Sequence, residues 1–383
     1  MSLFLEPQTS LQLREVADGA RAFLLGPVAQ VWSRGGQLLN GLFPERFEHS
    51  GLENTEYFRT FVQARHIFSF ACIGHLGWDG PWRELIAGAL ETLLTSAKRP
   101  DGLFVHKMDS NAVPLDQRAD LYDQAFVLLA LAVSGSSLER PQFFDEAENL
   151  LTRIKERWSH PQGGYREGEI ADATVRRQNP HMHLLEAFLA LSEASNRPVF
   201  AAAAQEIAEL ARDSFIDPPS GALLEYFSED FQAADGLAGR IAEPGHCFEW
   251  AWLFERFAAT GSPEWIEVSD SLTEFGRKFG LDHDRGVAVN EVLTDGQLHD
   301  GRARLWPQAE RIKAAAIRCR RLGSEAEARE AVLATRGLEK YYDVPTPGLW
   351  RDKLNPDGSW LEELAPGSSL YHISCAYAEL MSA

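Results

Sequence analysis

Cysteine is scarce in this sequence. The chain has four cysteines in 383 residues, at positions 72, 247, 319 and 375, and no two of them have CxxC spacing. Each lies in a segment whose apolar residues have helical periodicity. A disulfide scaffold is typical of small, loop-rich chains with regularly spaced cysteines, and structural zinc usually needs paired thiolates. The cysteines therefore favour neither kind of protein.

Positive charge is also scarce. The chain has 37 lysines and arginines against 56 aspartates and glutamates, which gives a formal net charge of −19. Nucleic-acid binding requires clustered basic side chains, so we expect no nucleic-acid partner. The balance gives no reason to expect a polyanionic substrate, although a local basic pocket could hold one acid group.

Long apolar runs are missing as well. No stretch approaches the length that spans a bilayer. Residues 1–7 lack the basic start, apolar core and small-residue cleavage site of a secretory signal. We therefore expect a cytoplasmic enzyme with a small-molecule substrate and no membrane partner, acting as a monomer or a homodimer.

What the sequence does contain is an internal repeat. A glycine followed by an apolar or aromatic residue recurs in turn-like stretches with steps of 61, 62, 57, 65 and 62 residues. These glycines are Gly41, Gly102, Gly164, Gly221, Gly286 and Gly348. Turn-forming residues precede several of them. Glycine is common, so one match means little, but six at near-equal steps indicate a repeated unit.

The segments between these turns have helical patterns. Apolar residues recur at helical spacing over 120–133, 181–194, 200–213, 246–259, 307–321 and 324–341. A step of about 60 residues accommodates two ordinary helices and their loops. Segments 57–76 and 246–256 are apolar nearly all round, as expected of an inner ring. The sequence predicts an all-α fold, an (α/α)6 barrel of six helix hairpins forming a single catalytic domain over residues 1–383, with an open solenoid as the alternative.

A series of polar residues runs in phase with the glycines. One lies 19 to 25 residues after each glycine, near the start or middle of a predicted inner helix. These residues are Arg65, Tyr122, His183, His246, Gln308 and His372. Equivalent positions in a closed barrel converge on its axis, so we expect these six side chains to surround one cavity. Such a cavity is the natural candidate for an active site.

Local motifs sharpen this expectation. His183 and Glu186 are three residues apart, as are His246 and Glu249, so each carboxylate lies on the same helix face as an imidazole whose basicity it would raise. Each motif alone is more often ordinary packing or a surface pair. These pairs together with Glu310 could also bind a metal, but carboxylate-bridged sites in helix bundles use a different order of ligands, so no metal is predicted.

With these motifs the chain resembles the N-acylglucosamine 2-epimerase superfamily over nearly its whole length. The matching segments are Ala64-Arg65, Asp120–Asp123, Asn179–Glu186, Pro244–Trp250, Trp306–Glu310 and Tyr371-His372. The family fold is an (α/α)6 barrel. Within the superfamily, residues 370–380 are most similar to the mannose isomerases. Residue 305 is leucine, where cellobiose epimerases tend to have a second tryptophan.

The resemblance implies a role for each matching residue. His246 and His372 would act as general base and acid at C1 and C2 of the sugar, His183 would help to open the ring, and Arg65 would stabilise an enediolate. The substrate would be held by Tyr122, Asn179, Glu249, Trp306, Gln308 and Glu310. The implied reaction converts D-mannose into D-fructose through a cis-enediol, with no cofactor and no metal because hydrogen moves as a proton.

Other functions remain open at this point. A sugar 2-epimerase would use the same groups. A sulfoquinovose isomerase would need an anion site, for which Arg176, Arg177 and Arg240 are candidates, although solvated loop charge explains them better. A glycoside hydrolase on the same barrel would use Asp123 with Glu249 or Glu310. A non-catalytic sugar-binding protein would not need the two histidines.

Overall fold

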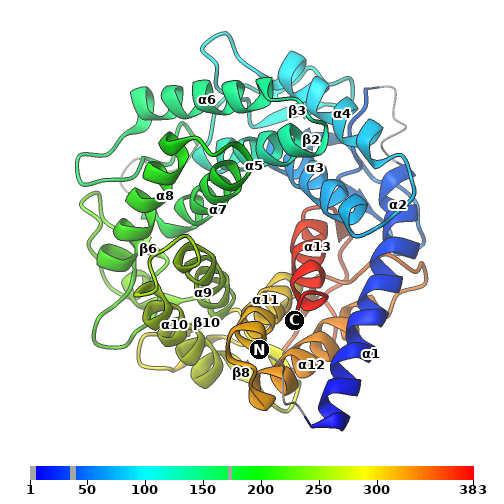
Figure 1. The fold of residues 1–383 in the computed structure, drawn as a ribbon, viewed down its shortest axis with the longest axis vertical. Helices are drawn as coiled ribbons and strands as arrows, with labels where there is room; N and C mark the ends of the chain where they lie inside the picture. The colour runs from blue at the N-terminus through cyan, green and yellow to red at the C-terminus, as the bar shows by residue number, and fades with distance from the viewer. Residues whose placement is uncertain (1–5, 35–39, 171–174) are drawn as a thin grey trace.

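The computed structural model describes residues 6–34, 40–170 and 175–383, so residues 1–5 of the N-terminal segment considered above lie outside it. The described chain forms two concentric rings of helices (Figure 1). The inner ring consists of α3 (Thr60–His75), α5 (Leu121–Ser137), α7 (Gln178–Ser195), α9 (Pro244–Ala258), α11 (Leu305–Leu322) and α13 (Ser369–Leu380). The outer ring consists of α4 (Trp82–Thr92), α6 (Gln142–Trp158), α8 (Pro198–Leu210), α10 (Trp265–Gly280), α12 (Glu325–Glu339) and α1 (Pro7–Phe23), which continues through a π-helical turn (Leu24–Val28) into α2 (Ala29–Ser33).

The inner ring is closed by contact between its first and last helices. Helix α13 packs against both α11 and α3, and α1 packs against α12 on the outside. Figure 1 shows α13 beside α3, although the two are far apart in the sequence. The predicted (α/α)6 barrel is therefore confirmed, and the open-solenoid alternative is wrong.

The two rings bury their side chains differently. Nearly every residue of α5 is buried, as expected for a helix that contacts neighbours on all sides. The outer helix α6 buries Phe144, Ala147, Leu150, Leu151, Ile154 and Trp158, which form a single stripe at helical spacing. Burial of each large apolar side chain stabilises the fold by about 1.5–3 kcal/mol, so hydrophobic patterning is enough to sort the helices into two layers.

The six repeat glycines all lie in turns with left-handed backbone, with φ between 65° and 93°. This region disfavours residues that have a Cβ atom, which explains why glycine recurs there. In three of the units, an inner-helix glutamine holds the loop that follows, because its amide oxygen and nitrogen bond to the backbone N–H and C=O of one residue. The pairs are Gln63 with Phe43, Gln124 with Phe104, and Gln308 with Ala288. The prediction that Gln308 faces the cavity is therefore wrong: its side chain is fully buried in this backbone clamp.

Short antiparallel strands precede most of the inner helices and form one rim of the barrel. The pairs are β1 (Arg46–Phe47) with β14 (Ala365–Pro366), β5 (Arg176–Arg177) with β6 (Tyr226–Phe227), β8 (Leu281–Asp282) with β9 (Val287–Ala288), and β12 (Ala303–Arg304) with β13 (Lys353–Leu354). The three-stranded sheets are β2 (Tyr57–Arg59), β3 (Lys107–Asp109) and β4 (Pro114–Asp116), and β7 (Ile241–Ala242), β10 (Glu291–Leu293) and β11 (Leu298–Asp300). Residues 57–59 were expected to be helical, but they pair with β3, and α3 begins at Thr60.

Among the helices of the described residues, none has the length and apolar character needed to cross a membrane.

Candidate active site

All six inner helices begin at the strand-covered mouth of the barrel. A cavity of about 490 Å³ opens there, lined at its inner end by Arg65, Trp306, Ser369 and His372. A second hollow of about 250 Å³ lies next to it and contains Tyr122 and Asn179. Arg65 lines the first hollow and bonds to Tyr122 in the second, so the predicted residues from α3, α5, α7, α11 and α13 reach one mouth.

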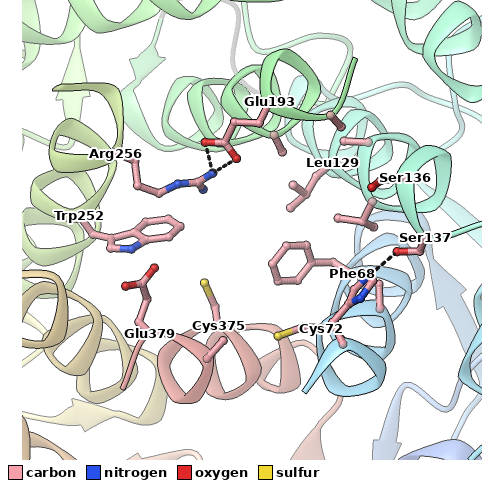
Figure 2. Close-up of a pocket in the computed structure, with 17 residues that line it drawn as sticks. Phe68, Cys72, Leu129, Ser136, Ser137, Glu193, Trp252, Arg256, Cys375 and Glu379 are labelled. Carbon is pink, nitrogen blue, oxygen red and sulfur yellow. Dashed lines mark hydrogen bonds and ion pairs between the residues drawn. The ribbon is translucent and has the colours of Figure 1, made fainter. Parts of the chain in front are cut away.

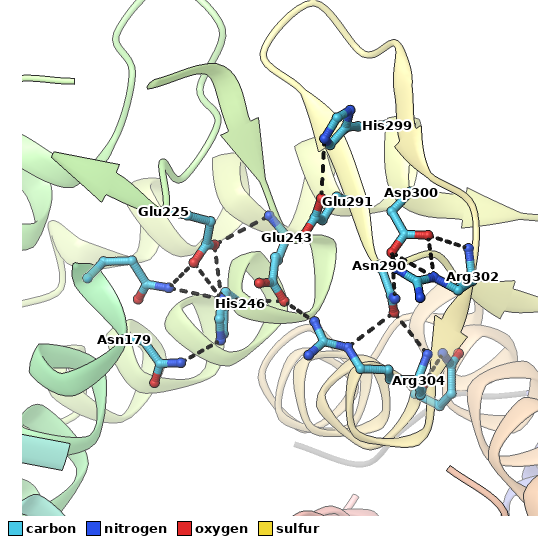
Figure 3. Close-up of polar contacts among 12 residues, drawn as sticks. Asn179, Glu225, Glu243, His246, Asn290, Glu291, His299, Asp300, Arg302 and Arg304 are labelled. Carbon is cyan, nitrogen blue, oxygen red and sulfur yellow. Dashed lines mark hydrogen bonds and ion pairs between the residues drawn. The ribbon is translucent and has the colours of Figure 1, made fainter. Parts of the chain in front are cut away.

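His246, in the first turn of α9, is held by a carboxylate that the sequence analysis did not identify. Its Nδ1 lies 2.9 Å from both oxygens of Glu225, and its Nε2 lies 3.4 Å from the amide nitrogen of Asn179 (Figure 3). Burial disfavours protonation of this imidazole, but Glu225 and Glu243 outweigh it and raise the pKa of His246 to about 9. His246 is therefore a cation at neutral pH. Among the described residues Glu249 makes no direct contact with His246, but its charge adds to the raised pKa, as the sequence analysis expected.

His372, in the first turn of α13, is in the opposite electrostatic environment. Its Nδ1 lies 2.6 Å from Glu310, and the other oxygen of Glu310 lies 2.6 Å from the ammonium of Lys313. Burial, together with the cations Arg65 and Lys313, lowers the pKa of His372 well below its ordinary value. The imidazole is therefore neutral, and donation from Nδ1 to Glu310 leaves Nε2 as a free base. Glu310, expected to bind a sugar hydroxyl, orients this histidine.

Trp306 lies beside both imidazoles. Its ring centroid is 4.7 Å from that of His246 and 5.6 Å from that of His372, so the same indole packs against both imidazoles. The close approach depends on Gly245, because a Cβ atom at that position would lie 2.5 Å from the indole. The arrangement places a cationic and a neutral imidazole near one aromatic surface.

Arg65 supplies a positive charge to the cavity. Its guanidinium donates to Tyr122 Oη at 2.6 Å and to the carbonyl of Ser368 at 3.3 Å, and it lies 4.3 Å from the ring of Phe126. Within the described part of the chain, no carboxylate forms an ion pair with it, and its Nε has no hydrogen-bond partner. The side chain is 5% exposed. This charge is therefore available to a developing anion, which is the role that the family resemblance implies.

His183 and Glu249 lie deeper, beneath the cavity. His183 is 3.4 Å from Glu186, packs on Phe126, and has a pKa lowered to about 4 by burial. Burial raises the pKa of Glu249 to about 7, and its nearest charged partner is Lys313 at 3.6 Å. Neither side chain lines the 490 Å³ cavity, so their predicted contacts with substrate require entry of the sugar below Arg65.

Among the residues that the structure describes, three groups of histidine and carboxylate ligands have spacing that could hold a metal ion: His183 with Glu186 and Glu249, His246 with Glu225 and Glu243, and His372 with Glu249 and Glu310. Cationic side chains already lie against these carboxylates, with Lys313 beside Glu249 and Glu310 and Arg304 2.6 Å from Glu243. The metal-free mechanism stays a prediction.

The missed carboxylate Glu225 belongs to a second series in the repeat. A polar residue stands four positions after a turn glycine in every unit: Glu45, His106, Glu167 (counted from Gly163), Glu225, Asn290 and Asp352. These residues bond to side chains near the starts of inner helices, for example Glu45 to Arg59, His106 to Asp123, and Asp352 to Ser369. The constant spacing of four residues after a glycine is present in the sequence and could have identified Glu225.

None of the predicted anion-binding arginines lines the 490 Å³ cavity, although Arg177 lines the 250 Å³ hollow beside it. Arg176 is buried and forms an ion pair with Glu167, so its interpretation as solvated loop charge is wrong. Arg240 is exposed and bonds to Asp295. The cations that do line the cavity include Arg46, Arg59 and Lys353, which the sequence analysis did not single out.

The opposite mouth of the barrel contains a different cavity, of about 520 Å³. Figure 2 shows Phe68, Leu129, Trp252 and Cys375 facing into it from the C-terminal halves of the inner helices. The buried ammonium of Lys313 lies 3.8 Å from the centroid of Trp252 on this side and 2.6 Å from Glu310 on the side of the histidine pair.

Comparison with known proteins agrees with this geometry. The family model for N-acylglucosamine 2-epimerase (GlcNAc 2-epimerase) matches residues 41–376. The chain belongs to this family. A mannose-6-phosphate isomerase of Rhizobium meliloti (strain 1021) is 41% identical to this GlcNAc 2-epimerase family member, over 89% of the chain and 90% of that protein. A D-mannose isomerase of Thermobifida fusca is 30% identical over 78% and 77%.

The family member also shares its fold with a solved structure of D-mannose isomerase. The TM-score is 0.83 at 19% identity, covering 97% of each chain. This GlcNAc 2-epimerase family member is therefore an enzyme, a sugar isomerase or epimerase, and not a non-catalytic sugar-binding protein.

Proposed function

We propose that the enzyme is an aldose–ketose isomerase for a sugar of mannose configuration, with fructose configuration in the product. The observation that supports this best is the pair of imidazoles in opposite states beside Trp306: His246 with Glu225, and His372 with Glu310. Transfer of a proton between adjacent carbons needs one base and one acid at neutral pH, and this pair supplies them.

His372 acts first, as the base that removes the proton from C2 of the open-chain aldose. The electrons form a C1=C2 double bond, and charge develops on the carbonyl oxygen at C1. His246 donates a proton to that oxygen, and Arg65 stabilises the charge in a buried setting where a fixed cation is effective. Return of the proton from His372 to C1, with transfer of the O2 proton to the now neutral His246, gives the ketose and restores both histidines.

Epimerisation is the competing outcome from the same enediol. It requires a proton to reach C2 from the face opposite to His372. Relatives named as isomerases, at 41% and 30% identity, favour return to C1. The two relatives are named for different substrates, one for a phosphorylated mannose and the other for free D-mannose.

The hydrolase alternative has less support. Asp123, its first expected carboxylate, accepts hydrogen bonds from His106 at 2.8 Å and from the backbone of Phe61 at 3.1 Å. Glu310 is occupied by His372 and Lys313. These carboxylates position other groups, and the opposed imidazoles have no use in glycoside hydrolysis.

Proton NMR of EDTA-treated enzyme in D2O tests the proposal with D-mannose and D-mannose 6-phosphate as separate substrates. We expect the matching fructose product, with deuterium entering at C1 or C2. The corresponding glucose as first product would make the enzyme a 2-epimerase. Activity lost to EDTA and restored by a divalent metal would contradict the metal-free mechanism.

A further inference from the structure

The catalytic cavity is strongly cationic in an acidic protein. Its lining contains five cationic side chains, Arg46, Arg59, Arg65, Arg304 and Lys353, and two carboxylates, Asp352 and Glu363. The whole chain has a formal net charge of −19. A neutral sugar needs hydroxyl partners and gains little from so many cations, so their concentration at one mouth points to an anionic ligand.

The charges are not all neutralised by neighbours. In the parts of the chain that the structure describes, no carboxylate forms an ion pair with Arg46, whose guanidinium donates to Tyr57 Oη at 3.0 Å. The ion pair between Lys353 and Glu363 has a length of 2.9 Å, with side chains 29% and 36% exposed. An ion pair this exposed is weak and opens at little cost. Arg46 and Lys353 are therefore available to a ligand.

The backbone places these cations at the outer end of the cavity. Arg46 lies on β1 opposite Pro366 of β14, immediately before α13. Lys353 lies on β13 opposite Arg304 of β12, immediately before α11. Arg59 ends β2, immediately before α3, and is fixed by Glu45 through its Nε at 2.9 Å.

The catalytic groups stand two to six residues after these strands, on the helices that follow them. His372, Trp306 and Arg65 lie on α13, α11 and α3 and line the inner end of the cavity. A ligand that reaches both ends must present a reactive carbon at one end and an anion at the other. The N-termini of these helices add a favourable field for negative charge.

We infer that the cavity takes a sugar that carries a tetrahedral oxyanion on its terminal carbon, a phosphate ester in the first instance, bound at the rim by Arg46, Arg59 and Lys353. This inference rests on the proposed isomerase function, because it requires C1 and C2 at the histidines. Guanidinium groups bind phosphate with paired hydrogen bonds, and an ammonium adds a point charge. A sulfonate has the same shape, so the two anions are distinguished by experiment.

Steady-state kinetics and calorimetric binding with D-mannose, D-mannose 6-phosphate and a 6-sulfonated hexose test the inference. For wild type we expect kcat/KM at least tenfold higher for the phosphate ester than for free mannose, and a KM that rises with salt. R46Q and K353Q should each raise KM for the phosphate ester at least tenfold, with kcat and the kinetics of free mannose within about twofold. R302Q is the matched control, since Arg302 is exposed, bonds to Asp300 and lies outside the cavity lining.

The outcomes separate the two proposals. Turnover of free mannose at equal or higher efficiency, with R46Q and K353Q unchanged, would overturn the anion site and leave the isomerase intact. Tight binding of the phosphate ester that R46Q weakens, without turnover of any sugar, would support the anion site and contradict the isomerase. A tenfold preference for the sulfonate would support the rim site and assign its anion to a sulfonate. If R302Q weakened binding of the phosphate ester as much as R46Q does, the effect would come from the overall charge of the protein. That result would overturn the assignment of the rim site.

Discussion

The two mouths of the barrel are built from the same six helices and have opposite chemistry. At the N-terminal mouth, Arg65, Trp306 and His372 from the first two turns of their helices line a cation-rich cavity, and the ring of His246 lies beside Trp306. At the C-terminal mouth, residues further along the same helices, such as Phe68 on α3, line a largely apolar cavity (Figure 2). Helix N-termini favour anions, and the reaction and the inferred ligand both place negative charge at that end.

The largest expected difference between the mouths comes from α13. His372→Asn removes the neutral base, and we expect kcat to fall about 10²–10⁴-fold, the usual value of general-base catalysis. Cys375→Ala, one turn further along the helix at the other mouth, should leave kcat within about twofold. Stopped assays of ketose formation with both variants, and thermal melts that show equal folding, measure this. Equal losses in the two variants would mean that α13 acts only through packing.

Arg65 gives the next largest effect. Arg65→Gln removes the buried charge opposite the developing enediolate, and kcat should fall about 10²–10³-fold, as for loss of one oxyanion-stabilising group. Arg256→Gln is the counterpart at the other mouth, where Arg256 forms a 2.8 Å ion pair with Glu193. Its activity should stay near wild type. If the two arginines were equally important for turnover, the functional asymmetry of the mouths would be lost.

The pH profile tests the role of Glu225. The raised pKa of His246 means that it is protonated below about pH 9, so activity should decline as pH rises through about 9. The lowered pKa of His372 means that it stays neutral until the pH falls well below its ordinary value, so the acid limb should lie below about pH 6.5. Glu225→Gln should move the alkaline limb downward, because the carboxylate that stabilises the imidazolium is gone. An unmoved limb with reduced kcat would indicate only a structural role.

A smaller effect is expected from a single added carbon. Gly245→Ala would place Cβ 2.5 Å from the indole of Trp306, which must move away from both histidines. We expect about a tenfold loss in kcat/KM, comparable to misplacing a positioning group by a fraction of an ångström. Gly88→Ala in the outer helix α4 is the control, with open space around the new carbon. It should raise stability by about 0.5–1 kcal/mol without changing kinetics.

The sequence predicts the barrel more completely than it predicts the site. The helices follow from local apolar periodicity, and the glycine turns from their positive φ, so the barrel was predictable. Arg65, Tyr122, His246 and His372 were found because they share a phase with those turns.

The pairings of these residues were not predicted, although both carboxylates could be located in the sequence. Glu225 stands four residues after Gly221, in the same repeat unit as His246, and reaches it from a rim loop. Glu310, expected to bind a sugar hydroxyl, reaches His372 from the neighbouring inner helix α11. Lys313 has the spacing of an ordinary helical lysine, yet it is fully buried among carboxylates. The repeat phase identifies where such residues stand, but which side chain a carboxylate contacts depends on the tertiary structure, and this contact sets the protonation of each histidine.

The central claim is that the two histidines at the N-terminal mouth are held in opposite protonation states. Nitrogen-15 NMR of histidine-labelled enzyme, titrated from pH 5 to pH 10 and assigned with His246→Asn and His372→Asn, measures those states directly. The account predicts that His246 remains an imidazolium until about pH 9, while His372 is neutral throughout the range in which an ordinary histidine titrates. Both imidazoles titrating together near pH 6.5 would contradict it.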